Sequence, residues 1–199
     1  MSEQASYSSS QSPVTPAIVS GKRLTEARVA ILSDTHGHLD PRIAETIAGT
    51  DYAIHAGDIM GAEILEALRA RTGEVVAVAG NNDQPGIWPD GAEEVVRTLP
   101  RIAHLHLPGG TLAVEHGHYH GHTKPDHGSL RDTHAGSRLV VYGHTHRVCD
   151  DCDADPRVVN PGAAGRTRTH GAPSCLILHA GSDEWVLETF RFPQEAVRA

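Results

Sequence analysis

Five short polar motifs, each directly after an apolar run, constrain the fold of this 199-residue chain more than any other feature. They are Asp34-Thr35-His36, Gly57-Asp58, Gly80-Asn81-Asn82-Asp83, His116-Gly117-His118 and Gly143-His144-Thr145-His146. The apolar runs predict strands, and ligands of α/β proteins gather beyond the carboxyl ends of strands. The motifs supply carboxylate, amide and imidazole groups suited to two divalent cations about 3.5–4 Å apart.

The order of the apolar runs predicts an α/β fold. In the first half we expect strands at 28–33, 52–56 and 74–79, the last buried on both faces, a helix opened by Asp40-Pro41, and a helix over about 62–71. In the second half, 101–107 and 111–115 flank a Pro-Gly-Gly turn and predict a hairpin. A loop or short helix is expected over 124–135, and strands at 138–142, 157–159, 174–179 and 185–192. This order predicts two sheets packed face to face with helices outside.

The first 24 residues differ from the rest in composition. They are rich in Ser, Gln, Pro and Thr and carry few large apolar groups, so burial cannot offset the entropy of ordering them. We therefore expect a disordered tail over residues 1–24 and a single domain over residues 25–199, a length that suits one core.

Composition also excludes some classes of function. No apolar run approaches the roughly 20 residues that span a bilayer, so we expect no membrane role. A formal charge of −8 argues against nonspecific nucleic-acid binding as the function, since that binding depends on clustered Lys and Arg. Three cysteines, Cys149, Cys152 and Cys175, form no disulfide framework, and the chain does not start with a signal-like segment. We expect a cytoplasmic protein.

Each motif in the first half also has a simpler explanation. Asp34 and His36 could belong to a cap or turn, Asp58 could cap a helix, and Gly80–Asp83 could be a turn. As a metal site, Asp34 and His36 would face the same side of an extended segment and bind one ion. Asp58 could lie between two ions because a carboxylate has two oxygens with several lone pairs.

The histidine motifs give the stronger local signal. His144 and His146, separated by one residue, can reach neighbouring ions from a single segment, and His116 adds a nitrogen ligand. A later Cys149-Asp-Asp-Cys152 spacing matches half of a zinc knuckle, but the sequence has no second pair, so we interpret it as incidental.

In this order, the motifs resemble the pattern of the calcineurin-like metallophosphoesterase superfamily: Asp-x-His, Gly-Asp, Gly-Asn-x-Asp or Glu, a later His, and Gly-His-x-His. Ser33–Gly37 and Asn160-Pro161-Gly162 look like the small bacterial and archaeal YfcE-like phosphodiesterases, and the resemblance spans about 29–168. It implies a four-layer α/β/β/α sandwich of two mixed sheets with flanking helices. It also implies a hydrolase of small phosphodiesters.

The resemblance assigns the metal ligands residue by residue. It implies that Asp34, His36 and His146 bind the first metal, that Asn81, His116 and His144 bind the second, and that Asp58 bridges the two. A hydroxide held between the metals would attack phosphorus in one in-line step. Mixed oxygen and imidazole ligands favour Mn, Fe, Zn or Ni, with Mn as the first choice. We also expect Asn81 and His116 to contact the substrate.

One departure from the family pattern concerns catalysis. Many members carry a histidine after the metal-binding asparagine, where it is thought to protonate the leaving group, and this chain has Asn82 there. An amide is not a general acid. The catalytic candidates are Asn82, which stands at the position of the family's acid, and His118. Since Asn82 cannot donate the proton, His118 is the leading substitute for the acid, with His38 or a metal-bound water as alternatives. His118 could instead be a surface histidine.

Several questions stay open at this point. Arg166 and Arg168 could contact phosphate or form a solvated basic loop. A retromer subunit of similar fold acts as a protein-binding scaffold after losing metal-site histidines, but all seven ligand positions here hold competent residues, which disfavours that alternative. A phosphomonoesterase or a nucleic-acid substrate is a further alternative. The sequence does not fix the native metal, the substrate or the oligomeric state, a homo-oligomer included.

Overall fold

The strands of the first half form one sheet with the last two strands of the chain. The computed structural model describes residues 17–20, 25–69 and 71–193. Within them the sheet has the order β11-β10-β2-β3-β4. Its members are β2 (Glu26–Leu32), β3 (Tyr52–His55), β4 (Glu74–Ala77), β10 (Ser174–Gly181) and β11 (Trp185–Arg191). Strands β2, β3 and β4 are parallel, and β10 is antiparallel to both β2 and β11, so the sheet is mixed.

The second half forms the other sheet, whose order is β1-β5-β6-β7-β9-β8. Its strands are β1 (Ala17–Ser20), β5 (Ile102–Leu107), β6 (Gly110–Glu115), β7 (Leu139–Val141), β8 (Val148–Asp151) and β9 (Arg157–Pro161). The predicted hairpin is confirmed, since β5 and β6 pair antiparallel across Pro108 and Gly109. Strands β6, β7 and β9 are parallel, so this sheet is mixed as well.

The two sheets pack face to face over the main core. Alternation along each strand sends Val29 and Ile31 of β2 and Leu112 and Val114 of β6 into one cluster, in which each is fully buried. Burial of each such side chain contributes roughly 1.5–3 kcal/mol relative to exposure. This interface is the predicted sheet-on-sheet core.

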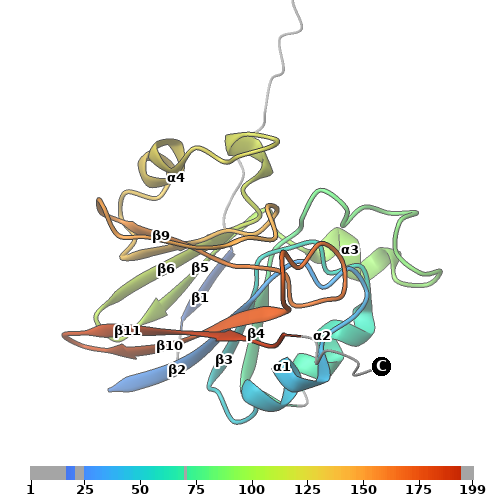
Figure 1. Cartoon of the computed structure of the whole chain (residues 1–199), viewed down its shortest axis with the longest axis horizontal. Helices are drawn as coiled ribbons and strands as arrows, with labels where there is room; N and C mark the ends of the chain where they lie inside the picture. Colours follow the sequence, from blue (N-terminus) through green and yellow to red (C-terminus); the bar gives the residue numbers. More distant parts are fainter. Residues whose placement is uncertain (1–16, 21–24, 70, 194–199) are drawn as a thin grey trace, which may run out of the picture.

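Helices cover the two outer faces and complete four layers (Figure 1). Helix α4 (His127–Thr133) places Leu130 against Val140 and Val158 on one outer face. On the other outer face, Ala30 and Leu32 of β2 share a cluster with residues of α1 (Pro41–Thr46) and α2 (Ala62–Arg69). The predicted α/β/β/α sandwich is confirmed.

The helix starts follow local signals in the sequence. The Asp40 side chain accepts a hydrogen bond from the Arg42 amide at 2.9 Å, and Pro41 is the first residue of α1, as predicted. Helix α2 begins at Ala62 as predicted and buries three apolar side chains, Ile64, Leu65 and Leu68. None of the helices in the described part of the chain has the length and hydropathy to span a lipid bilayer.

Three expectations differ from the structure. Ala17–Ser20, within the expected tail, form β1 and pair in parallel with β5 as an edge strand. Residues 1–16 and 21–24 lie outside the described residues, so the tail over 1–24 and the single domain over 25–199 stay predictions. The strand expected over 74–79 is not buried on both faces, because β4 lies at the sheet edge and Glu74 is exposed. Strand β8 and helix α3 (Glu93–Thr98) were not predicted.

Candidate metal centre

The predicted ligands meet at one rim of the sandwich, where strands of both sheets end. Asp34 follows β2, Asp58 follows β3, His116 follows β6, and His144 and His146 follow β7. Backbone hydrogen bonds join these loops: Asp34 donates to the Gly57 carbonyl at 3.0 Å, His36 to that of Asp58 at 3.0 Å, and Gly143 to that of His116 at 3.2 Å. The structure therefore brings segments of both sheets into one site.

The backbone at this rim adopts an unusual conformation. Five of the seven predicted ligand positions have a left-handed backbone without being glycine: Asp34 (φ 55°), His36 (46°), Asp58 (53°), His144 (67°) and His146 (57°). Such a conformation costs of order 1–3 kcal/mol per residue and persists where the surroundings over-determine it, often at functional sites. Neighbouring glycines provide the space, since a Cβ on Gly80 would clash with Asp58 and one on Gly143 with Ser33.

Asp34, His36 and His146 form the first cluster. One ligand atom from each lies within 4.8 Å of the others. His146 Nε2 is 3.3 Å from Asp34 Oδ1 and 3.1 Å from His36 Nε2. Asp34 is fully buried, and both of its carboxylate oxygens lack a hydrogen-bond partner. This set is the one that the family resemblance implies for the first metal.

The second group surrounds Asp58. Asp34, Asp58 and His116 also have ligand atoms within 4.8 Å of one another. Asp58 Oδ2 lies 3.7 Å from His36 Nε2 and 3.5 Å from His116 Nε2, so it stands between the two predicted sets. His144 Nδ1 approaches Asn81 Oδ1 at 2.9 Å. Asp58 therefore lies between the first cluster and His116, and His144 lies beside Asn81.

The hydrogen bonds of the four imidazoles orient their lone pairs. In each ring one nitrogen contacts an acceptor outside the centre: His36 Nδ1 and Met60 Sδ (3.1 Å), His116 Nδ1 and Ala56 O (2.7 Å), His144 Nε2 and His122 O (2.5 Å), His146 Nδ1 and Thr167 O (3.0 Å). A carbonyl or thioether only accepts, so these nitrogens carry the proton. The other nitrogen of each ring then turns its lone pair toward the centre, as in metal-ligating histidines.

This arrangement fits divalent cations. Asp34 has no donor for its oxygens, and His116 Nε2 is buried without a hydrogen-bond partner. The pairs of facing acceptors repel one another unless positive charge lies among them. Burial would lower the pKa of His116, but Asp58 and Asp34 outweigh burial and raise it to about 9. Without a cation this ring therefore carries a positive charge beside the two carboxylates, and a bound cation would take the place of its Nε2 proton. The donor set is the oxygen and imidazole mixture that suits Mn, Fe, Zn or Ni.

The sequence model of the calcineurin-like phosphoesterase superfamily domain matches residues 28–183. The chain belongs to this superfamily. A phosphodiesterase from Methanocaldococcus jannaschii is 29% identical over 172 residues, which cover 79% of this chain and 96% of that protein. Membership in this superfamily agrees with the order of the motifs and with the observed fold.

Solved structures share the fold of this superfamily member. An archaeal phosphodiesterase superposes with a TM-score of 0.63 at 21% identity, covering 82% of this chain and 99% of that one. Vacuolar Protein Sorting 29 from Cryptosporidium parvum superposes with a TM-score of 0.66 at 19% identity, covering 85% of this chain and 100% of that one. At these identities the likeness shows the fold alone.

The two predicted catalytic side chains differ in what they contact. Asn82 donates from its backbone amide to Asp58 Oδ1 at 2.8 Å and from its side chain to Asp58 Oδ2 at 2.7 Å. His118 Nδ1 is buried without a hydrogen-bond partner, and its ring centroid lies 5.5 Å from that of His116 and 6.1 Å from that of His144. Burial, followed by His116 and His144, lowers the pKa of His118 to about 4.

Sequence reasoning missed residues that support the phosphoesterase loops. The buried Asp83 carboxylate accepts hydrogen bonds from the backbone amides of Ile59 (2.9 Å), Met60 (3.1 Å) and Gly80 (2.8 Å), and so joins the loops after β3 and β4. Asp83 is the last residue of the Gly-Asn-x-Asp motif, and this position in the motif could have indicated that it supports the loops.

His55 supports the neighbouring loops in a similar way. Its Nδ1 accepts from the Gly57 amide at 3.2 Å and its Nε2 contacts Thr35 Oγ1 at 3.0 Å. Burial lowers the pKa of His55 to about 3, so the ring stays neutral at pH 7. A histidine within an apolar strand, just before Gly57-Asp58, was the signal in the sequence.

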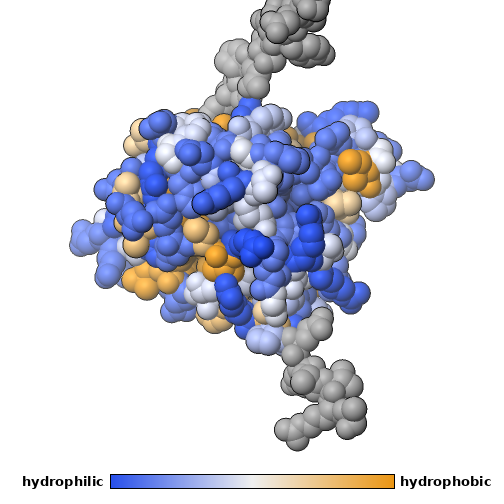
Figure 2. Space-filling view, turned by 45° about the horizontal axis from the view of Figure 1, so that its top comes forward, coloured by the Kyte–Doolittle hydropathy of each residue, from blue (hydrophilic) through white to orange (hydrophobic). Residues whose placement is uncertain are grey.

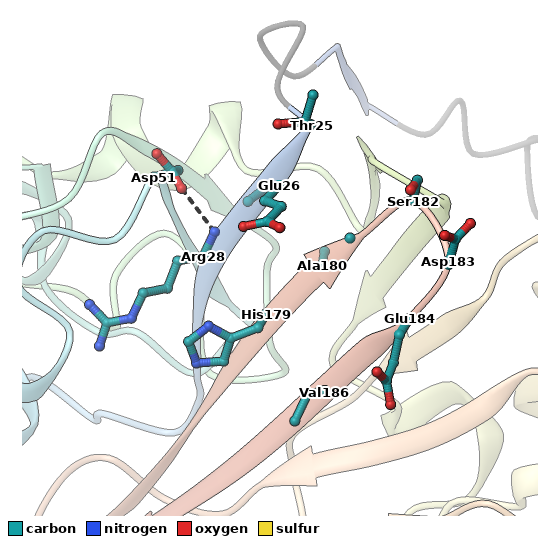
Figure 3. A pocket seen from close by; sticks show the side chains of 12 residues that line it. Thr25, Glu26, Arg28, Asp51, His179, Ala180, Ser182, Asp183, Glu184 and Val186 are labelled. Atoms are coloured by element: carbon teal, nitrogen blue, oxygen red, sulfur yellow. Dashed lines mark hydrogen bonds between the residues drawn. The ribbon is translucent and has the colours of Figure 1, made fainter.

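A larger cleft of about 680 Å³ lies at the opposite end of β2 (Figure 3). Glu26, Arg28 and His179 line it, together with Asp51 and the 181–184 turn. Two of its charged side chains, Asp51 and Arg28, have partners within the protein: Asp51 accepts from the Arg28 amide at 2.8 Å, and the Arg28 guanidinium reaches the Ala48 carbonyl at 3.5 Å. Its size alone would make this cleft the candidate functional site. The buried ligand atoms without hydrogen-bond partners favour the metal centre instead.

Proposed function

We propose that this superfamily member is a dinuclear metal-dependent phosphodiesterase that hydrolyses a small phosphodiester. The observation that carries the proposal is the buried, unpartnered Asp34 carboxylate among four imidazoles whose lone pairs face inward. The 29% identical archaeal relative, which is named a phosphodiesterase, supports the diester.

The two groups of neighbouring ligand atoms around Asp34 and Asp58 support an assignment of ligands to two cations. Asp34, His36 and His146 would hold one cation, Asn81, His116 and His144 would hold the other, and Asp58 would contribute to both. Two bound divalent cations supply an activated water and neutralise charge on the phosphoryl oxygens. Mn²⁺ is the first choice for assays, with Fe, Zn and Ni as the alternatives.

The residues around the ligands orient them. The two hydrogen bonds from Asn82 hold the Asp58 carboxylate in one orientation, so Asn82 acts as a positioning residue rather than as an acid. We keep Asn81, which lines the cleft over the centre, and the buried His116, which does not line it, as proposed substrate contacts. His118, at the side of His116 and His144, stays the candidate proton donor, although its pKa of about 4 leaves only a small fraction of the ring protonated at pH 7.

The test is metal-dependent turnover. Purified protein stripped of metal and reloaded with Mn²⁺ is assayed on bis-p-nitrophenyl phosphate and on p-nitrophenyl phosphate, and its metal content is measured. We expect two metal ions per chain and faster turnover of the diester. Faster turnover of the monoester would instead identify a phosphomonoesterase.

A non-catalytic scaffold is the alternative that shares this fold. A scaffold needs a docking surface, which is usually a large exposed apolar patch. Figure 2 shows a face on which hydrophilic residues dominate and apolar ones lie in small separate groups. Across the described residues the exposed large apolar side chains, Ile18, Ile87, Tyr119 and Val186, belong to different segments. Protein that binds no metal and turns over neither substrate would support the scaffold.

The location and assembly of the protein belong to the same proposal. We propose a cytoplasmic enzyme, and the three unpaired cysteines, Cys149, Cys152 and Cys175, are compatible with a reducing compartment. Cell fractionation tests the location. Light scattering of the purified chain decides between a monomer and a homo-oligomer.

A further inference from the structure

The loop after the Asn160-Pro161-Gly162 turn lies against the metal centre. Its Thr167 carbonyl accepts from His146 Nδ1 at 3.0 Å, and Arg168 Nη2 donates to His146 Nε2 at 3.2 Å. Arg168 has a left-handed backbone, with φ of 49°. The loop thus binds His146 through both ring nitrogens, and the Arg168 guanidinium contacts the nitrogen that faces the centre.

Arg168 also lines the cleft over the metal centre. This cleft has a volume of about 450 Å³. Its other lining residues are Asp58, Asn81, Asn82, His122, Thr123, His144 and Thr145. Arg168 is the one arginine or lysine among the lining residues, so it brings a permanent positive charge to the place where a substrate would enter.

The contact between Arg168 and His146 is incompatible with a metal on His146. Nε2 of a neutral imidazole has a single lone pair, which either accepts from the guanidinium or binds a cation. This step rests on the proposed function: a metal that binds His146 Nε2 releases Arg168 and places a positive charge beside the guanidinium. The freed guanidinium stays at the cleft with N–H donors in a planar fork, a geometry that matches two phosphoryl oxygens.

We propose that Arg168 binds the phosphoryl group of the substrate once metal loading has released it from His146. In the metal-free protein the same side chain occupies the His146 lone pair and competes with the metal. Arg168 is thus a substrate-binding residue whose availability depends on the metal.

The neighbouring arginine provides a matched control. Arg166 lies in the same loop and is exposed, but it does not line the cleft. Arg166→Ala removes the same charge two positions away. Any effect of long-range charge alone appears in both variants, whereas the specific contact is lost only in Arg168→Ala.

The proposal predicts opposite changes in two affinities. Removing Arg168 removes a competitor for His146, so we expect the Kd for Mn²⁺ to fall about threefold or more. It also removes a charge-assisted contact, so we expect the Kd of the Mn²⁺-loaded protein for inorganic phosphate to rise about tenfold. A merely structural role would weaken both affinities together.

Titration calorimetry on the full chain tests both predictions, with wild type, Arg168→Ala, Arg168→Lys and Arg166→Ala. Arg168→Lys keeps the charge without the planar fork, and we expect its phosphate affinity to lie between those of wild type and Arg168→Ala. The inference is overturned if Arg168→Ala binds Mn²⁺ more weakly, or if its phosphate affinity equals that of Arg166→Ala. Wild type that binds no Mn²⁺ at all would overturn the proposed function instead, so the two failures are distinct.

Discussion

Two groups of buried carboxylates and imidazoles lie next to each other in this chain, and their atoms approach to different distances. In the first, which we name the Glu115 cluster (Glu115, His120 and His134), Glu115 Oε1 accepts from His134 Nε2 at 2.7 Å and from His120 Nε2 at 2.9 Å. In the metal centre, the contacts between carboxylate oxygen and imidazole nitrogen measure 3.3, 3.5 and 3.7 Å. The first distances are those of ordinary hydrogen bonds, whereas the second exceed the usual range of about 2.7–3.2 Å.

The difference separates histidines that the protein satisfies from histidines that it leaves for a ligand. Glu115 is the last residue of β6 and His116 follows it directly, so their side chains point to opposite faces of the sheet. Burial would raise the pKa of Glu115, but His120 and His134 outweigh burial and lower it to about 2. This carboxylate is therefore an anion whose Oε1 is paired within the protein, while Oε2 is buried without a hydrogen-bond partner. Adjacent residues thus serve structure on one face and the proposed chemistry on the other.

The sharpest test of this comparison replaces the central carboxylate of the metal centre. Asp58→Asn removes the anion between the two ligand sets and keeps the side-chain size. We expect Mn²⁺-dependent turnover of bis-p-nitrophenyl phosphate to fall at least about a hundredfold. Equal turnover by variant and wild type would refute the bridging role.

The matched change in the other cluster should act on stability. Glu115→Gln leaves His120 and His134 without their anion, and we expect the free energy of unfolding to fall by about 2 kcal/mol. Denaturant unfolding measures this loss. The number of metal ions bound per chain should stay that of wild type, and a change in that number would mean that the two clusters are not separate.

A smaller effect is expected from the residue that orients Asp58. Asn82→Ala removes the side-chain hydrogen bond of 2.7 Å to Asp58 Oδ2, and we expect Mn²⁺ to bind about tenfold more weakly. Asn82→Asp, of the same shape, should lose more because it repels Asp58. Wild-type affinity in Asn82→Ala would show that Asn82 does not position the carboxylate.

The smallest effect concerns the proton donor and depends on the leaving group. A p-nitrophenolate leaving group needs little protonation, so His118→Asn should lower its release by no more than about threefold, and that of an alkoxide by about tenfold or more. His38→Asn is the control, since His38 was the alternative donor. A dependence on the leaving group in His38→Asn alone would transfer the role to His38.

Local signals in the sequence were enough for most of the fold. Asp40-Pro41 marked the start of α1 because a side-chain cap and a proline are read from neighbouring residues. Strand β1 was missed because its partner β5 lies far along the chain, and no local pattern encodes that pairing. Strand β8 was missed because Val148–Asp151 holds two acidic residues and is paired only at the sheet edge.

The residue types at the site could be predicted from the sequence, but the orientation of their side chains could not. The motifs placed Asp34, Asp58 and His146 at strand ends, and the structure brings them together. The protonation pattern of the imidazoles could not be predicted, because it depends on backbone carbonyls, such as those of Ala56 and Thr167, that any residue type provides. Left-handed φ angles at non-glycine residues likewise carry no mark in the sequence.

The rim where the two sheets meet has a consequence for the lifetime of the folded state. His36 and His146 are 110 positions apart and come from different sheets, yet their ring nitrogens lie 3.1 Å from each other. A cation held by both would cross-link the sheets, so that separating them requires coordination bonds to break first. Loading with metal is then expected to slow unfolding itself, and resistance to a protease that cleaves only opened chains would report it.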